Sequence, residues 1–175
     1  NAIPDWTYAL TPGLRFLTNN GTIRPWGVGY YGADYPAGRQ LERFVNRGTL
    51  EAVAHEIACG EFEDSGTIEN DNDLRIFAQT ITLQNGYHSV NGGAHYFAND
   101  VKLRGQRVVA ARGLFLNPTN SLADAGPGSN NSFELADGFH LLRKPRYGDL
   151  FGSTFETRAP RFASVAHTWA AEDRG

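Results

Sequence analysis

Three of the five histidines lie between residues 87 and 140, and tyrosines are adjacent to two of them. An imidazole titrates near neutral pH, so it can both accept and donate a proton without a metal ion. Tyr87 and His88 are adjacent in the stretch GYHSVNGG, and His95 follows in GGAHYFAND. These residue types predict acid–base chemistry, and we expect His95, His88 and Tyr87 to be catalytic.

Other aromatic and polar side chains are suited to holding a small ligand, since rings supply contact area and polar tips supply orientation. The predicted ligand-binding set comprises Trp26, Tyr30, Tyr96, Phe97, Asn99, Arg112, His140 and Arg158. Strand alternation in GGAHYFAND places His95 and Phe97 on one face and Tyr96 on the other. We expect the face with His95 to point inward, because Phe97 gains from burial. The alternative for each ring is ordinary core packing.

Two patterns suggest metal ligands, but both depart from the spacing that a metal requires. Glu51, His55 and Cys59 would share one stripe of a helix, yet the second histidine of an H-E-x-x-H zinc motif is missing. The acidic run EFEDSGTIENDND lacks the glycine and the final glutamate of a calcium loop, so a solvated acidic loop is favoured. Ser89 lacks the small flanking residues of a hydrolase nucleophile. We therefore expect no metal and no cofactor.

The elements that must position these residues are mostly strands. Residues 49–59 carry the one helical pattern, with Thr49 as the N-cap and Gly60 after the end, whereas residues 39–48 fit a helix or a strand. From residue 66 onward, strand-like segments alternate with turns such as Asn85-Gly86 and Arg104-Gly105. No internal repeat is evident. We predict one domain over residues 1–175, mainly β, folded as a single antiparallel β-barrel of the calycin or lipocalin type with one short helix.

Composition excludes several partners. The net charge is −3 and the pI is near 5.9, and no basic stripe occurs, which argues against nucleic acid. No apolar run has the roughly 20 residues that a membrane helix requires. Asn20-Gly21-Thr22 and Asn130-Asn131-Ser132 match the N-glycosylation pattern, and the chain has no methionine. We therefore expect a secreted or otherwise processed protein, with a cytoplasmic location as the alternative.

Three segments resemble a known protein family. FETRAPRF (155–162), AHYFANDVKLRGQRVVAARG (94–113) and AGRQLERFVNRGTLEA (37–52) are similar to segments of an uncharacterised family of small calycin-like β-barrel proteins, a domain of unknown function. The resemblance implies a barrel with an internal pocket and no established activity. One departure is that the family continues as a strand after G-T-x-E, where this chain has the helical pattern of residues 49–59.

These observations support a small-molecule-binding barrel that isomerises, cyclises or dehydrates an apolar or aromatic metabolite without a cofactor. Whether the protein turns over its ligand, and whether it forms a homodimer, are left open. The alternative is a non-catalytic ligand-binding, carbohydrate-binding or interaction module. In that case exposed rings at Trp6, Trp26 and Tyr30 would form a stacking platform for sugars.

Overall fold

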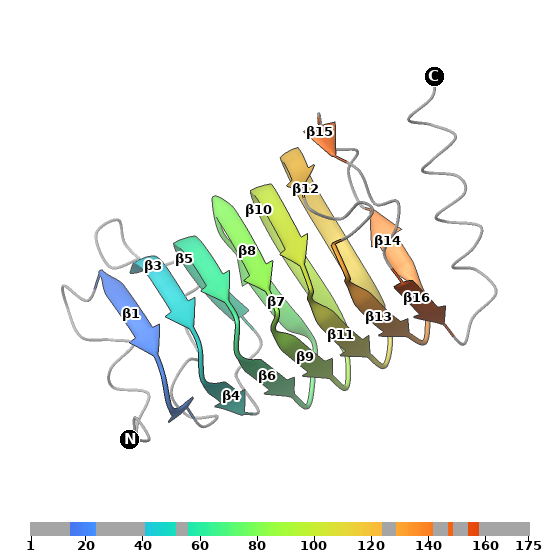
Figure 1. Cartoon of the computed structure of the whole chain (residues 1–175), viewed down its shortest axis with the longest axis horizontal. Helices are drawn as coiled ribbons and strands as arrows, with labels where there is room; N and C mark the ends of the chain where they lie inside the picture. Colours follow the sequence, from blue (N-terminus) through green and yellow to red (C-terminus); the bar gives the residue numbers. More distant parts are fainter. Residues whose placement is uncertain are drawn as a thin grey trace.

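The structure is a computed structural model that describes residues 15–23, 41–51, 56–123, 129–141, 147–148 and 154–157. Its strands wind around one axis as a parallel β-solenoid (Figure 1). Successive coils stack side by side along that axis, so each strand pairs with its counterparts in the neighbouring coils. Every strand pair in the described residues is parallel.

The strands form two sheets. The nine-stranded sheet contains β1 (Phe16–Asn19), β3 (Leu41–Asn46), β5 (Glu56–Asp64), β7 (Leu74–Phe77), β8 (Thr80–Gln84), β10 (Gly93–Arg104), β12 (Gly113–Ala123), β14 (Phe139–Leu141) and β15 (Tyr147–Gly148). The seven-stranded sheet contains β2 (Thr22–Ile23), β4 (Thr49–Glu51), β6 (Thr67–Asn70), β9 (Tyr87–Val90), β11 (Arg107–Ala110), β13 (Ser132–Leu135) and β16 (Thr154–Thr157).

The chain has a structural repeat that the sequence analysis missed. Thr67 pairs with Tyr87, and Tyr87 pairs with Arg107, so the central coils are 20 residues long. The coil before them, from Thr49 to Thr67, has 18 residues, and the coil from Arg107 to Ser132 has 25. Unequal coils obscure a fixed period, which is why the repeat is hard to see in the sequence alone.

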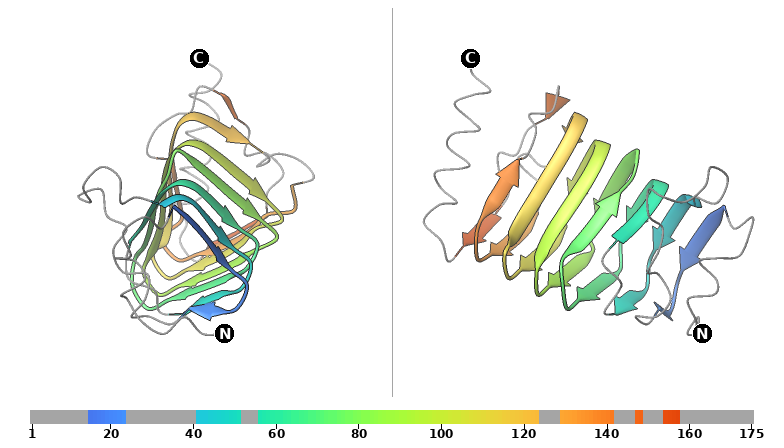
Figure 2. Two further views of the ribbon diagram at one scale, coloured as in Figure 1. Left: turned by 90° about the vertical axis from the view of Figure 1, so that its left-hand side faces the viewer. Right: turned by 180° about the vertical axis from the view of Figure 1, so that it is seen from behind.

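Each coil has a three-sided outline when viewed along the axis (Figure 2). Face 1 is formed by the start of β5, β7, the first half of β10, the first half of β12, and β14. Face 2 is formed by β1, β3, the end of β5, β8, the second halves of β10 and β12 beyond a register shift between Ala98 and Asp100, and β15. Face 3 is the seven-stranded sheet. The corners are named by the faces they join: the 1–2, 2–3 and 3–1 corners.

The interior of the described coils is packed with apolar side chains. Alternate residues of the strands point inward, as in β8, where Ile81 and Leu83 are fully buried. Phe44 and Phe62 pack edge to face with their ring centroids 5.4 Å apart. Burial on this scale is the main stabilising contribution, about 25 cal/mol per Å² of apolar surface.

The predicted antiparallel calycin-like barrel is therefore wrong. Inward–outward alternation and regular turns are common to a barrel and a solenoid, and only the pairing of distant coils separates the two. The interior is also filled by side chains, among them Phe44, Phe62 and Tyr96, where the barrel reading required a ligand cavity.

The predicted helix over residues 49–59 is also wrong. Residues 49–51 form β4 and residues 56–64 belong to β5, while residues 52–55 lie outside the described part. Ile57 and Phe62 are fully buried against neighbouring coils, so tertiary burial overrides the helical propensity of the alanines. Residues 41–46, which fitted helix or strand, form β3. Among the described residues, we find no helix with the length and hydrophobicity to cross a bilayer.

Candidate functional site

Face 1 carries a ladder of stacked rings on its outer surface. His95 in β10, Phe115 in β12 and His140 in β14 occupy equivalent positions, with centroids 4.4 and 4.5 Å apart and planes within 8° of parallel. A second column stacks Phe77 of β7 on Phe97 at 4.8 Å. We call these five partly exposed rings the ring ladder.

The rings of the ladder present their edges to solvent. The His95 and Phe97 planes lie within 7° of each other, so the two columns are parallel. Since the rings stack from strand to strand, their planes lie across the solenoid axis and neighbouring faces contact each other. The outward surface is therefore a flat strip of ring edges, and the edges of the three phenylalanine rings carry the positive part of the ring quadrupole.

A glycine stands two positions before each ring of the first column, and Gly93 and Gly113 leave room for rings of that column. Gly93, Gly113 and Gly138 precede His95, Phe115 and His140 at the 3–1 corner. A Cβ atom at Gly93 would lie 2.6 Å from Nε2 of His95 and 3.1 Å from a carbon of Phe115. The recurring pattern Gly-x-His or Gly-x-Phe was the available sequence signal for this ladder, and the sequence analysis did not detect it.

A polar hollow adjoins the ladder at the 3–1 corner. It has a volume of about 310 Å³ and is lined by Asp71, Asn72, Asp73, Arg75, Asn91, Gly92 and Arg112. Asp73 is its central group: the Gly93 N–H donates to Oδ1 at 2.8 Å, and the guanidinium groups of Arg75 and Arg112 each lie 3.6 Å from a carboxylate oxygen. Carboxylate acceptors and guanidinium donors thus face one space.

Two pKa shifts define the charge state of this corner. The hydrogen bond from Gly93 lowers the pKa of Asp73, and Arg112 and Arg75 lower it further. Partial burial lowers the pKa of His95 below 6.5, and Arg75, Arg112 and His140 add to this, while Asp73 opposes it. Near neutral pH, Asp73 is therefore ionised and His95 is uncharged, leaving one ring nitrogen as an acceptor.

The structure brings four of the predicted site residues together, but outside the coil. His95, Phe97 and His140 belong to the ring ladder, and Arg112 lines the adjoining hollow. The expectation that His95 points inward is wrong. Tyr96 is the fully buried residue, since its hydroxyl finds a partner inside, and His95 and Phe97 are stabilised by stacking on the outer face.

His88 and Tyr96 lie in the interior, where they form a polar network with Asp64. His88 donates from Nε2 to Oδ2 of Asp64 at 3.0 Å, and the Tyr96 hydroxyl donates to Nδ1 of His88 at 2.5 Å. All three side chains are buried, and burial, followed by the charge of Asp64, raises the pKa of Tyr96. Asn46 donates to the other oxygen of Asp64 at 2.6 Å, and Asn19 donates to Asn46 at 2.8 Å. The network thus links successive coils from within.

The remaining predicted residues are dispersed. Tyr87 lies on face 3, with the Arg107 guanidinium 5.1 Å from its ring centroid. Asn99 lies at the 1–2 corner and accepts a hydrogen bond from Thr119 at 2.8 Å. Trp6, Trp26, Tyr30 and Arg158 lie outside the described residues.

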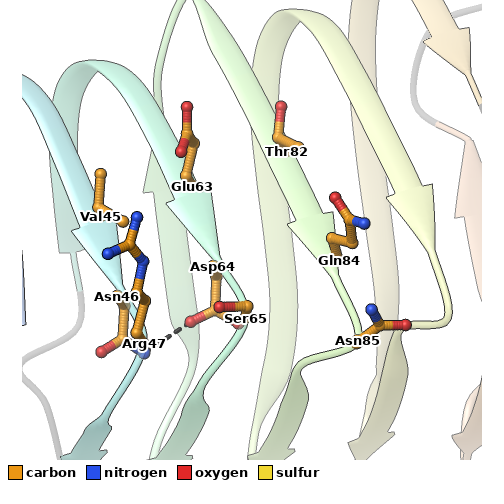
Figure 3. A pocket seen from close by; sticks show the side chains of 9 residues that line it. All are labelled: Val45, Asn46, Arg47, Glu63, Asp64, Ser65, Thr82, Gln84 and Asn85. Carbon is orange, nitrogen blue, oxygen red and sulfur yellow. Dashed lines mark hydrogen bonds between the residues drawn. The ribbon is translucent and has the colours of Figure 1, made fainter. Parts of the chain in front are cut away.

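A second hollow lies on face 2 near the 2–3 corner (Figure 3). It has a volume of about 280 Å³ and is lined by Val45, Asn46, Arg47, Glu63, Asp64, Ser65, Thr82, Gln84 and Asn85. Glu63 of β5 and Thr82 of β8 rise from neighbouring strands, and the Asn46–Asp64 hydrogen bond lies at its lower edge. No aromatic ring lines this hollow, so it has hydrogen-bonding groups without the apolar surface of face 1.

The predicted metal patterns are arranged differently in the structure. Glu51 lies in β4 and Cys59 in β5, so the helix that would align them with His55 does not form, and His55 is outside the described part. Burial raises the pKa of Cys59 to about 12, which makes its thiolate inaccessible at neutral pH. Most of the acidic run belongs to β5 and β6, where Arg43 pairs with Glu63 at 2.5 Å. Within the described ranges, no three histidine, cysteine or acidic side chains are grouped to hold a metal.

The ring ladder and the polar hollow are assigned from the geometry of this chain. No known protein-family model matches the chain, and comparison with curated proteins and with solved structures also finds no match.

Proposed function

We propose that the protein is a non-catalytic carbohydrate-binding module that uses face 1 as its binding surface. One observation carries the proposal: the ring ladder, a flat and partly exposed strip of phenyl and imidazole rings, adjoins a hollow lined by carboxylate, amide and guanidinium groups. Sites that combine apolar contact area with a few oriented polar groups are typical of ligand recognition.

The chemistry of a sugar matches both halves of this surface. A sugar ring has apolar C–H groups, which suit the ring ladder, and hydroxyl groups that both donate and accept hydrogen bonds. Asp73 offers a charged acceptor, and Arg75 and Arg112 offer donors, so each hydroxyl role has a counterpart in the hollow. Because the ring faces are occupied by neighbouring rings, the ladder provides an apolar floor and the hollow provides orientation.

Acid–base catalysis at His95 is the second candidate function. The uncharged state of His95 near neutral pH favours it, because a neutral imidazole beside a carboxylate and two guanidinium groups is able to accept a proton. The same ligand series tests it: product formation that is lost in His95→Phe, a change that retains an aromatic ring at that position, would support catalysis over binding alone.

Isothermal titration calorimetry with a panel of mono-, oligo- and branched saccharides tests the proposal. Arg112→Ala removes one donor of the hollow, and Arg112 is 67% exposed, so the variant should fold normally. We expect it to weaken binding by about tenfold, the loss of a charged hydrogen bond. Arg107→Ala, an arginine of face 3, is the matched control and should leave affinity unchanged. The proposal fails if no saccharide binds, or if the face 3 variant weakens binding as much.

A further inference from the structure

We infer that the ligand is an extended, unbranched and uncharged glycan that lies along the solenoid axis with one sugar unit on each coil of face 1. The inference rests on the proposed carbohydrate-binding function and identifies the class of carbohydrate. Its basis is the register of five neighbouring strands and the charge balance of the polar hollow.

Face 1 repeats along the axis in steps of one strand. Glu56, Arg75, His95, Phe115 and His140 occupy equivalent positions on the neighbouring strands β5, β7, β10, β12 and β14. Adjacent strands are about 4.8 Å apart, and the stacked rings repeat at 4.4 and 4.5 Å. The length of one pyranose unit in an extended chain is close to this step. A chain parallel to the axis therefore meets an equivalent side chain at each unit.

A ligand with another orientation or another shape would contact fewer of the equivalent positions on face 1. A chain that ran along a strand would cross only His95 and Phe97 on β10, which are 6.2 Å apart between ring centroids. A compact or branched ligand would contact one or two coils and leave the rest of the ladder exposed. Only an extended ligand along the axis covers all five positions.

The hollow favours a ligand without net charge. Two carboxylates, Asp71 and Asp73, face two guanidinium groups, Arg75 and Arg112, so the formal charges balance. An anionic chain would approach Arg112 but also the ionised Asp73, whose pKa is lowered by its surroundings. Hydroxyl groups bond to both kinds of partner, whereas a charged group is repelled by one of them.

The length dependence of binding tests this arrangement. Linear β-1,4-linked glucose oligomers of one to six units serve as probes in calorimetry with the full chain. We expect the affinity to rise by about tenfold or more from the dimer to the pentamer and to level off beyond it, because the described column has five positions. In His140→Ala, which removes the last ring, the plateau should move to a shorter oligomer, while Ser89→Ala on face 3 should leave it unchanged.

The possible results distinguish a failure of the extended-glycan inference from a failure of the proposed carbohydrate-binding function. An affinity that does not depend on chain length, or stronger binding of oligogalacturonates than of the neutral oligomers, overturns the extended, uncharged ligand. If a monosaccharide or a branched glycan binds instead and Arg112→Ala weakens it, the proposed function survives and the inference fails. If no saccharide of any kind binds, both fail.

Discussion

His88 has both ring nitrogens engaged inside the solenoid, an arrangement that resembles a proton relay but is closed within the interior. Its Nε2 donates a hydrogen bond to Asp64, and its Nδ1 accepts a hydrogen bond from the Tyr96 hydroxyl. The three side chains therefore satisfy one another's hydrogen-bonding groups. A buried carboxylate is tolerated only when it is paired and hydrogen-bonded, which Asn46 and His88 achieve together. At the residue scale, this network serves stability, whereas the other two histidines that the structure describes, His95 and His140, have partly exposed imidazoles on face 1.

Replacing His88 should reveal this structural role. His88→Ala leaves Asp64 and Tyr96 without a shared partner and opens a cavity, so we expect a loss of about 3–5 kcal/mol in the free energy of unfolding. Urea unfolding followed by circular dichroism measures it. Ser89→Ala, the outward-facing neighbour, should change the free energy by less than about 0.5 kcal/mol. Equal effects of the two variants would contradict the network.

The lowered pKa of His95 predicts a loss of stability in mild acid. Below pH 6.5 the unfolded chain binds a proton at His95 before the folded chain does, so protonation favours unfolding until the pH falls below the folded pKa. The stability that the uncharged His95 preserves is fully present above pH 6.5, and it is lost as the pH falls from 6.5 to the lower pKa of the folded state. His95→Phe should reduce the decrease in melting temperature between pH 7.5 and 5. A histidine NMR titration with an unshifted His95 would rule out this explanation.

Turn glycines of the 2–3 corner allow consecutive coils to stack closely. Gly21, Gly48 and Gly66 occupy equivalent positions, each followed by a threonine that begins a strand of face 3. A side chain at Gly66 would overlap the backbone carbonyl oxygen of Gly48 and lie 2.9 Å from Nδ2 of Asn46. At the element scale, these glycines permit the backbone of one coil to pass directly over the next.

Gly66→Ala should therefore destabilise the fold. The obstacle is a backbone carbonyl that cannot rotate away, so we expect a cost of about 1–3 kcal/mol. Ser65→Ala, the exposed residue before it, is the control and should be nearly neutral. Thermal melts of both variants provide the comparison, and a Gly66→Ala protein as stable as the control would contradict the close approach.

The same corner explains what the sequence could and could not predict. The strand character of β8, β10 and β11 and the turns at Asn85-Gly86 and Arg104-Gly105 were predicted correctly, because alternation and turn chemistry are local properties. The short strand β9 was not predicted. Parallel pairing depends on residues about 20 positions apart, and the signal for it was the recurrence of Asn-Asn-Gly-Thr, Asn-Arg-Gly-Thr and Asp-Ser-Gly-Thr at residues 19, 46 and 64. His95 and Arg112 were predicted as site residues because of their side-chain chemistry. That they lie near each other on the surface follows from the winding of the coils, which the sequence pattern did not predict.

The molecule as a whole behaves as a stack in which each coil is stabilised by its neighbours. Strand β10 pairs with β7, β8 and β12, whereas β1 pairs only with β3 among the described strands. Stability should therefore be highest in the central coils. Burial supports this: Phe16 of β1 is 62% exposed, while Tyr96 of β10 is fully buried.

Hydrogen–deuterium exchange should show this gradient. We expect the amides of β8 and β10 to exchange at the slowest rates, and those of β1 to exchange faster, because a terminal strand opens without disrupting a second neighbour. Mass spectrometry of peptides that cover residues 15–23 and 80–104 makes the measurement. Uniform protection across both segments would indicate that the coils unfold as one unit.

The regular step of the coils also has an evolutionary consequence. Each turn of the central chain adds about 20 residues and one equivalent position on face 1, as from Arg75 to His95 and from His95 to Phe115. An in-frame duplication or deletion of one such unit would lengthen or shorten the surface by a single position and leave the geometry of the others intact. The length of face 1 can thus change in whole-number increments through gene rearrangement, without the slow redesign that a closed pocket would require.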